Sequence, residues 1–148
     1  MTSVETIELV LPPHTNHHGT TFGGQIMAWI SNSSLICATR YARTDVIIHS
    51  VDDVHFVGPS MVGERIRITA RVMFCDGRNI EVGAQAEAHV VGGKERLITK
   101  AFLFFGTRRK QPPALSIQCA DEQEMRVRSE AIGRQGPSTM PSCDCMLF

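Results

Sequence analysis

The sequence has no excess of charge of either sign, because Lys plus Arg and Asp plus Glu each number 15 among 148 residues. A nucleic-acid partner is therefore not expected, since phosphate binding needs a local excess of cationic side chains. No apolar run reaches the about 18 residues that a membrane-spanning helix needs. The N-terminus also lacks the basic start and long apolar core of a signal peptide. We therefore expect a cytoplasmic location without stable membrane association.

Cysteine shows no pattern that would build a metal site. The five cysteines are an odd number without metal-ligand spacing, and Cys37 and Cys75 fall in segments expected to be buried. Both are expected to be reduced thiols in a reducing cytosol. His14, His17 and His18 lie close together in sequence, but no Asp, Glu or Cys accompanies them in that loop. We therefore expect no metal and no cofactor.

The composition changes near Lys110. Periodic segments dominate before this point, and a sequence rich in Pro, Gly and charged residues follows it. We expect one folded domain over residues 1–108, which is long enough to bury a core, and a mostly irregular polar tail over residues 109–148. The C-terminal residues from Cys145 to Phe148 fit a prenylation signal, but they also fit a divergent chain end, and both interpretations stay open.

A long apolar segment without acidic residues follows a polar loop. No Asp or Glu occurs from Gly24 to Tyr41, and the first charged side chain is Arg40. We expect a helix over about residues 24–42. Apolar side chains recur along it at helical spacing: Ile26, Ile30, Cys37 and Tyr41 form one stripe, and Met27, Trp29, Leu35 and Ile36 widen it. A helix with this much apolar surface is normally wrapped by other structure.

Strand signals lie on both sides of the expected helix. Apolar and polar residues alternate in segments that are bounded by turn signals, which is typical of a sheet with one wet face. The expected strands cover residues 4–11, 46–57, 65–72, 80–90 and 97–105, with turns at Asp76-Gly77 and Gly92-Gly93. A curved antiparallel sheet laid along one long helix would bury every apolar face. This predicts an α+β protein with the hotdog fold.

The loop and the start of the helix carry a resemblance to a known family. Residues 14–29, which include His14-Thr15-Asn16-His17-His18-Gly19 and Thr21-Phe22-Gly23-Gly24-Gln25, resemble the hotdog acyl-CoA thioesterases. The segments 4–13, 55–65, 81–83 and 101–102 fit the same family in the same order. The nearest likeness is to the second hotdog module of cytosolic enzymes that combine two such modules with a lipid-binding START domain. The resemblance covers about residues 4–106.

The resemblance implies roles for the loop and the helix start. The family's catalytic asparagine maps onto Asn16, whose amide could place a water molecule or the thioester carbonyl; an Asn that merely shapes the loop is the alternative. Gly23 and Gly24 would let a carbonyl approach the backbone, with the Gly24 N–H as the oxyanion donor. A helix start too crowded for a Cβ is the other reading, and both can hold.

Further residues are candidates for contact with acyl-CoA. Arg108 begins a basic cluster that could hold one phosphate or form a solvated strand end. For the histidines of the loop, a surface position is the simpler alternative to lining a channel for CoA. The candidate substrate-binding residues are His14, His17, His18, Gly23, Gln25, His55 and Arg108.

The sequence departs from the family at the catalytic carboxylate. In the family this acid lies on the central helix, two residues after the aromatic position that Trp29 matches, and here that position is Ser31. A serine without a base beside it is a poor substitute. Asp52, Asp53 and Glu81 are possible stand-ins, but carboxylates on strands are usually solvated or paired.

Two functions therefore stay open. The first is an acyl-CoA thioesterase module that hydrolyses acyl-CoA to free fatty acid and CoA, as a homo-oligomer or with a partner hotdog module. The resemblance implies a site between modules, with the asparagine from one module and the acid from the other. The second is a non-catalytic hotdog half that binds acyl-CoA or a partner module. A hotdog dehydratase is disfavoured because no suitable pair of His and acid is marked.

Overall fold

A computed structural model describes residues 2–75 and 78–107. The predicted tail over residues 109–148, Arg108, Cys145 and the expected turn at 76–77 lie outside these ranges. The elements, in chain order, are β1 (Ser3–Leu9), the 3-10 turn η1 (Pro12–His14), α1 (Gly23–Ala42), β2 (Val46–Phe56), β3 (Arg65–Cys75), β4 (Asn79–His89) and β5 (Arg96–Thr107). Each predicted strand is present, with ends shifted by a few residues.

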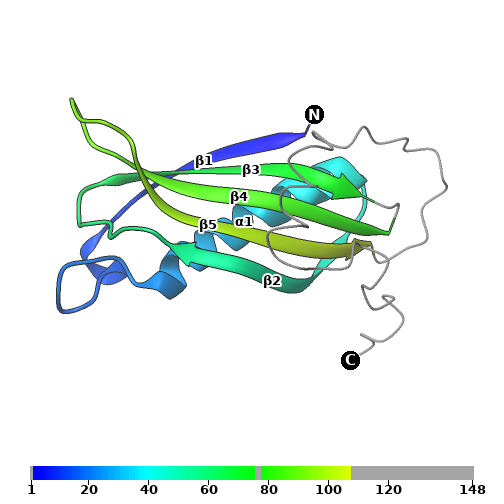
Figure 1. The fold of residues 1–148 in the computed structure, drawn as a ribbon, viewed down its shortest axis with the longest axis horizontal. Coiled ribbons are helices and arrows are strands. Elements are labelled where there is room, and N and C mark those ends of the chain that lie inside the picture. Colours follow the sequence, from blue (N-terminus) through cyan, green and yellow to red (C-terminus); the bar gives the residue numbers. More distant parts are fainter. Residues whose placement is uncertain (1, 76–77, 108–148) are drawn as a thin grey trace.

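The five strands form one antiparallel sheet in the order β1-β3-β4-β5-β2. Figure 1 shows α1 lying across one face of this curved sheet, with the β4–β5 hairpin projecting beyond the body. β1 and β2 are the two edge strands. The arrangement confirms the predicted α+β hotdog fold.

The sheet has an inner face toward α1 and an outer face. Along β4 every second residue is buried on the inner face, from Ile80 to Ala88, while the residues between them, such as Glu81 and Glu87, are only half-buried. This alternation confirms the predicted pattern, because successive side chains of a strand point to opposite faces. Val90 was expected to continue the inner row but is exposed, since the chain has already turned and the Gly93 N–H donates to its carbonyl at 2.9 Å.

Packing of α1 against the inner face differs from the prediction on one side. Of the predicted stripe, Ile26, Ile30 and Cys37 are buried and Tyr41 is half-buried. Trp29, expected to widen the stripe, is also buried. Leu35 and Ile36, however, are each 41% exposed, because the sheet covers one side of the helix and leaves the opposite side open. The predicted long helix and curved sheet are both present, and the sheet of this chain covers one side of the helix.

Polar contacts add to the packing of α1. The Ser33 hydroxyl is buried and lies 2.6 Å from the Thr6 hydroxyl of β1, so the helix and the edge strand share a hydrogen bond. The helix ends at Ala42, because Arg43 adopts a left-handed conformation (φ 52°) and donates its N–H to the Thr39 carbonyl at 2.9 Å. A left-handed residue at this point is a common helix stop.

The environments of Cys37 and Cys75 predict different reactivities. The Cys37 thiol is fully buried and donates to the Ala70 carbonyl at 3.5 Å. Burial raises the pKa of this thiol, because desolvation penalises the thiolate. Cys75 is only half-buried.

Labelling by iodoacetamide should therefore distinguish the two cysteines. Since the thiolate is the reactive form, iodoacetamide should label Cys75 much faster than Cys37 in the native protein and both equally in urea, as read by peptide mass spectrometry. Equal native rates would contradict the packing.

Candidate active site

The backbone of the loop before α1 forms a closed structure. Pro12 begins a 3-10 turn in which the His14 N–H donates to the Leu11 carbonyl at 2.9 Å and the Thr15 N–H donates to the Pro12 carbonyl at 3.1 Å. The Phe22 N–H then donates to the His14 carbonyl at 3.0 Å. The chain therefore returns to its own turn immediately before the helix begins.

Asn16 is bonded within this loop by both ends of its side-chain amide. Its Oδ1 accepts from the His18 N–H at 2.9 Å and from the Thr20 N–H at 3.3 Å. Its Nδ2 donates to the Thr20 hydroxyl at 2.9 Å, and that hydroxyl lies 3.1 Å from Oδ1. The loop-shaping reading of Asn16 is therefore supported by direct contacts.

The same contacts leave Asn16 one unused donor. A side-chain amide has two N–H groups, and within the described part of the chain one of them has a hydrogen-bond acceptor. Because Oδ1 is turned toward the loop backbone, the amide is held in a single orientation. Loop shaping and donation to a substrate can therefore occur together in Asn16.

The first turn of α1 has no side-chain cap. Phe22 precedes the helix, and its carbonyl accepts from the Gln25 and Ile26 N–H groups at 3.0 and 3.2 Å. The N–H groups of Gly23 and Gly24 have no acceptor among the residues that the structure describes. Free N–H groups at a helix start, together with the helix dipole, favour a negatively charged oxygen.

The two glycines have different surroundings. A Cβ on Gly23 would lie 3.3 Å from Cζ of Phe56, which is tight, whereas a Cβ on Gly24 would meet no atom within 4 Å. Crowding of the folded chain therefore explains a glycine at position 23 but not at position 24. The space on the Cβ side of Gly24 is therefore open.

Ser31 lies on α1 about two helical turns after Gly24, so the two residues share one side of the helix. Its side chain is half-buried. α1 carries no Asp or Glu over its whole length from Gly23 to Ala42. The candidate site therefore has no carboxylate from its own helix.

The stand-in carboxylates of the sheet lie away from the helix. Asp52 pairs with Phe102, and Glu81 pairs with Phe104, both on the outer face. Asp53 has a left-handed backbone (φ 52°), and its Oδ1 lies 2.7 Å from Nε2 of His55. None of these three side chains is placed beside the Gly23-Gly24 turn.

The histidines are divided between the loop and the outer face. His14 is half-buried with its ring edge-to-face to Trp29, at a centroid distance of 5.1 Å, and its Nδ1 accepts from the Leu11 N–H at 3.1 Å. His17 and His18 are exposed, with their rings 3.7 Å apart. His55 pairs with Lys100 on the sheet face opposite to Phe56. The structure thus brings His14 to the helix start but not His55.

Gln25 and Arg108 are the remaining candidate substrate-binding residues. Gln25 is half-buried in the first turn of α1, and Arg108 lies outside the described residues. Within the described ranges, no group of three His, Cys, Asp or Glu side chains could hold a metal ion. No helix in those ranges is long and apolar enough to cross a membrane.

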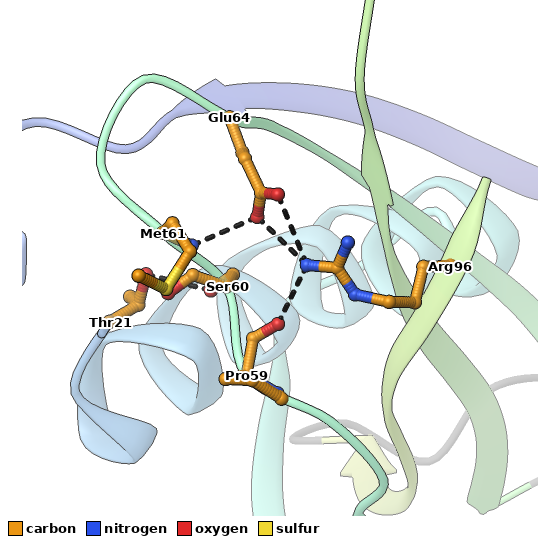
Figure 2. A network of polar contacts seen from close by, with 6 residues as sticks. All are labelled: Thr21, Pro59, Ser60, Met61, Glu64 and Arg96. Atoms are coloured by element: carbon orange, nitrogen blue, oxygen red, sulfur yellow. Dashed lines mark hydrogen bonds and ion pairs between the residues drawn. The ribbon is translucent and has the colours of Figure 1, made fainter. Parts of the chain in front are cut away.

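A polar network next to the loop was not found from the sequence. Figure 2 shows Glu64 and Arg96 joined to the connection between β2 and β3, and Ser60 of that connection bonded to Thr21. This connection lies within the segment 55–65, which the resemblance included, but nothing in the sequence indicated its contacts. The loop that carries Asn16 is thus held by contacts from distant parts of the chain.

A sequence model described as the thioesterase superfamily matches residues 18–89, which include the Gly23-Gly24 turn, α1, and the strands up to β4. The chain belongs to the thioesterase superfamily. This membership accounts for the long helix, the order of the strands and the glycine pair at the helix start, and it confirms the family resemblance of the sequence.

Individual relatives agree with this assignment. An acetyl-coenzyme A thioesterase of Mus musculus is 40% identical over 141 residues, which are 90% of this chain and 25% of the relative. The chain therefore spans about a quarter of the length of the first curated relatives that it matches.

Solved structures have the same fold as this chain. An apo-hexameric acyl-CoA thioesterase is 28% identical, and the match covers 89% of this chain and 87% of the thioesterase chain, with a TM-score of 0.76. An acyl-CoA hydrolase from Staphylococcus aureus was solved in complex with butyryl coenzyme A, coenzyme A and coenzyme A disulfide. It is 27% identical, the match covers 90% of this chain and 88% of the hydrolase chain, and the TM-score is 0.74.

Substitution of each glycine of the pair tests how crowded the helix start is. Gly24→Ala should leave the melting temperature unchanged or raise it, because the added Cβ meets no atom and Gly-to-Ala changes of this kind stabilise by about 0.4–1 kcal/mol. Gly23→Ala should gain less or lose stability, since the Phe56 ring must move. Thermal unfolding of the two variants measures the difference. A less stable Gly24→Ala protein would show that crowding governs both positions.

Proposed function

We propose that this chain is an acyl-CoA thioesterase module, which hydrolyses acyl-CoA to a free fatty acid and CoA. The observation that carries the proposal is the open, uncapped helix start at Gly24, preceded by a loop that holds the Asn16 amide in one orientation. Family membership supports the reaction class, and the similar hydrolase from Staphylococcus aureus was solved with butyryl coenzyme A.

The helix start is suited to the charge that develops in thioester hydrolysis. When water adds to the thioester carbonyl, the carbonyl oxygen becomes an oxyanion; the C–S bond then breaks, and the CoA sulfur leaves and takes up a proton. The Gly24 N–H, at the positive end of α1, would donate to this oxygen. The second N–H of the Asn16 amide would hold either the carbonyl or the attacking water.

The remaining requirement is a base that takes a proton from the water. Structures of the Staphylococcus aureus hydrolase include variants in which one asparagine or one aspartate is changed to alanine. In that protein the two residues are separated by the same number of positions as Asn16 and Ser31 here. This supports the assignment of Ser31 to the position of the missing acid. We infer that a partner module supplies the carboxylate.

A second function is favoured by the absence of any acid on α1. In this alternative the chain is a non-catalytic hotdog half that binds acyl-CoA or a catalytic module and shapes the partner's site. The two functions separate in a mixing experiment with the first hotdog module of a two-module enzyme. The thioesterase proposal expects hydrolysis that is lost with Asn16→Ala in this chain, whereas a non-catalytic half expects hydrolysis that is insensitive to Asn16.

A cytoplasmic location goes with this proposal. It is supported by Cys37, which is a buried free thiol in the structure, since the cytosol keeps thiols reduced. The proposed interaction partners are acyl-CoA and another hotdog module, either a second copy of this chain or a related one. No nucleic-acid partner and no stable membrane association are proposed.

The proposed partner leads to a prediction about oligomeric state. Among the residues that the structure describes, β1 and β2 are the sheet edges without a further strand, and such edges are normally paired or covered. Large apolar side chains are also exposed on α1 and β2, namely Leu35, Ile36, Ile47, Ile48, Val51 and Phe56. The protein should therefore form a dimer or a higher even-numbered oligomer. Light scattering at micromolar concentration measures this, and a stable monomer would contradict it.

The proposed loss of the acid gives a gain-of-function prediction. The chain alone should hydrolyse acyl-CoA weakly or not at all, and Ser31→Asp should raise the rate measurably. General-base assistance contributes about 10²- to 10⁴-fold, so that even a poorly aligned carboxylate would be detected. The half-buried charge should also lower the melting temperature. The rate is measured by release of the CoA thiol.

A matched control for this experiment is Asn32→Asp. It adds the same charge to the same helix at an exposed position that points about 100° away from Ser31. The control should not raise the rate, and Asn16→Ala should remove the activity gained with Ser31→Asp. Robust hydrolysis by the unmodified chain that persists in Asn16→Ala would overturn both the Asn16 assignment and the role given to Ser31.

A further inference from the structure

The connection between β2 and β3 is fixed by a charged pair. Nη2 of Arg96, at the start of β5, donates to the Glu64 carboxylate at 3.0 and 3.1 Å and to the Pro59 carbonyl at 2.9 Å. The same carboxylate accepts from the Met61 N–H at 2.9 Å. Figure 2 shows these groups around one guanidinium. Three contacts of Arg96 thus hold residues 59–64 to β5, and the contact between Met61 and Glu64 closes the connection on itself.

This connection in turn holds the residues that precede α1. Ser60 is buried, its hydroxyl donates to the Thr21 hydroxyl at 2.7 Å, and its carbonyl accepts from the Thr21 N–H at 2.8 Å. Met61 forms an isolated β-bridge with Thr20. Thr21 is two residues before Gly23, so a displacement of residues 59–61 would be transmitted to the helix start.

The contacts continue to Asn16 through Thr20. The Asn16 N–H donates to the Thr20 carbonyl at 2.9 Å, and the Thr20 hydroxyl contacts the Asn16 amide. A continuous series of contacts therefore runs from Arg96 and Glu64 to the two groups that the proposed reaction uses. One N–H of the Asn16 amide takes part in these contacts, whereas its second N–H and the Gly24 N–H have no acceptor among the described residues.

We propose that Glu64 and Arg96 are positioning residues, whose ion pair sets the location of the Asn16 amide and the Gly24 N–H. This inference rests on the proposed function. The Glu64 side chain is 15% exposed and accepts three hydrogen bonds, two of them from a guanidinium. Hydrogen bonds between ionised groups in such surroundings are stronger and more directional than neutral ones. The pair is therefore able to fix a loop whose large apolar side chains, Val57, Met61 and Val62, are exposed.

The effect should appear in the rate of reaction more than in binding. The oxyanion forms after substrate has bound, so that a misplaced donor weakens contacts made in the transition state and lowers kcat with little change in KM. Misplacement of a reacting group by about 1 Å can cost about 100-fold. We expect a fall in kcat of about 10- to 100-fold when the pair is broken.

Three variants of the 148-residue chain test this role. Glu64→Gln keeps an acceptor for the Met61 N–H but removes the charge, and Arg96→Met removes the partner at a largely exposed position. Glu87→Gln is the matched control, because Glu87 accepts from Arg67 at 2.8 Å in a similar ion pair on the outer face of the sheet. Each variant is assayed in complex with an acid-bearing hotdog module, and its melting temperature is recorded.

A second measurement does not depend on hydrolysis. In ¹⁵N-labelled protein, the side-chain amide resonances of Asn16 and the backbone resonances of Gly23 and Gly24 should shift in Glu64→Gln and Arg96→Met but not in Glu87→Gln.

The rate of hydrolysis gives one further comparison. The kcat of the double variant Glu64→Gln/Arg96→Met should be no lower than that of the slower single variant, because both changes break one interaction.

The outcomes separate this inference from the proposed function. If the wild-type complex hydrolyses acyl-CoA and both single variants keep its kcat, or if Glu87→Gln lowers kcat equally, the positioning role is overturned and the function stands. If the wild-type complex shows no hydrolysis, the proposed function fails. In that case the resonance shifts still decide whether the pair positions Asn16 and Gly24, and unshifted resonances would overturn the inference as well.

Discussion

The burial of one side of α1 against the sheet is the constraint on which the rest of the structure depends. Ile26 and Ile30 are buried there, and fully burying an isoleucine side chain contributes about 1.5–3 kcal/mol relative to exposure. Once the helix axis is fixed in this way, its first turn must emerge beside the end of β2, where the Phe56 ring contacts Gly23. The polar groups of the candidate site are thus located by apolar packing elsewhere along the helix.

Most of the fold could be predicted from the sequence because the packing uses simple periodicities. Alternation along β4 and helical spacing along α1 both report directly which side chains are buried. The exposure of Leu35 and Ile36 could not be predicted, since helical spacing defines an apolar stripe but does not say how much of it a sheet will cover. The hotdog arrangement could also be predicted, from the order of one strand, a long helix and four strands, whereas the order of the strands within the sheet was not predicted.

The candidate site was predictable only in part. The resemblance indicated Asn16 and the glycine pair, but the sequence treats Gly23 and Gly24 alike, and the structure distinguishes a crowded position from an open one. Glu64 and Arg96 are far apart in the chain, and their contact is created by the hairpin of β4 and β5. No local pattern reports such a contact, because either residue alone is typical of a solvated surface.

The lack of an acid on α1 also bears on the number of sites per assembly. In a pair formed with an acid-bearing module, the proposed site beside Asn16 would be complete, whereas the equivalent site beside the partner's own loop would face Ser31. A nearly symmetric pair of folds would then be functionally asymmetric, with one working centre instead of two. The maximum turnover of each pair would be that of a single site, and saturation with a tight-binding substrate analogue would require one molecule for every two modules.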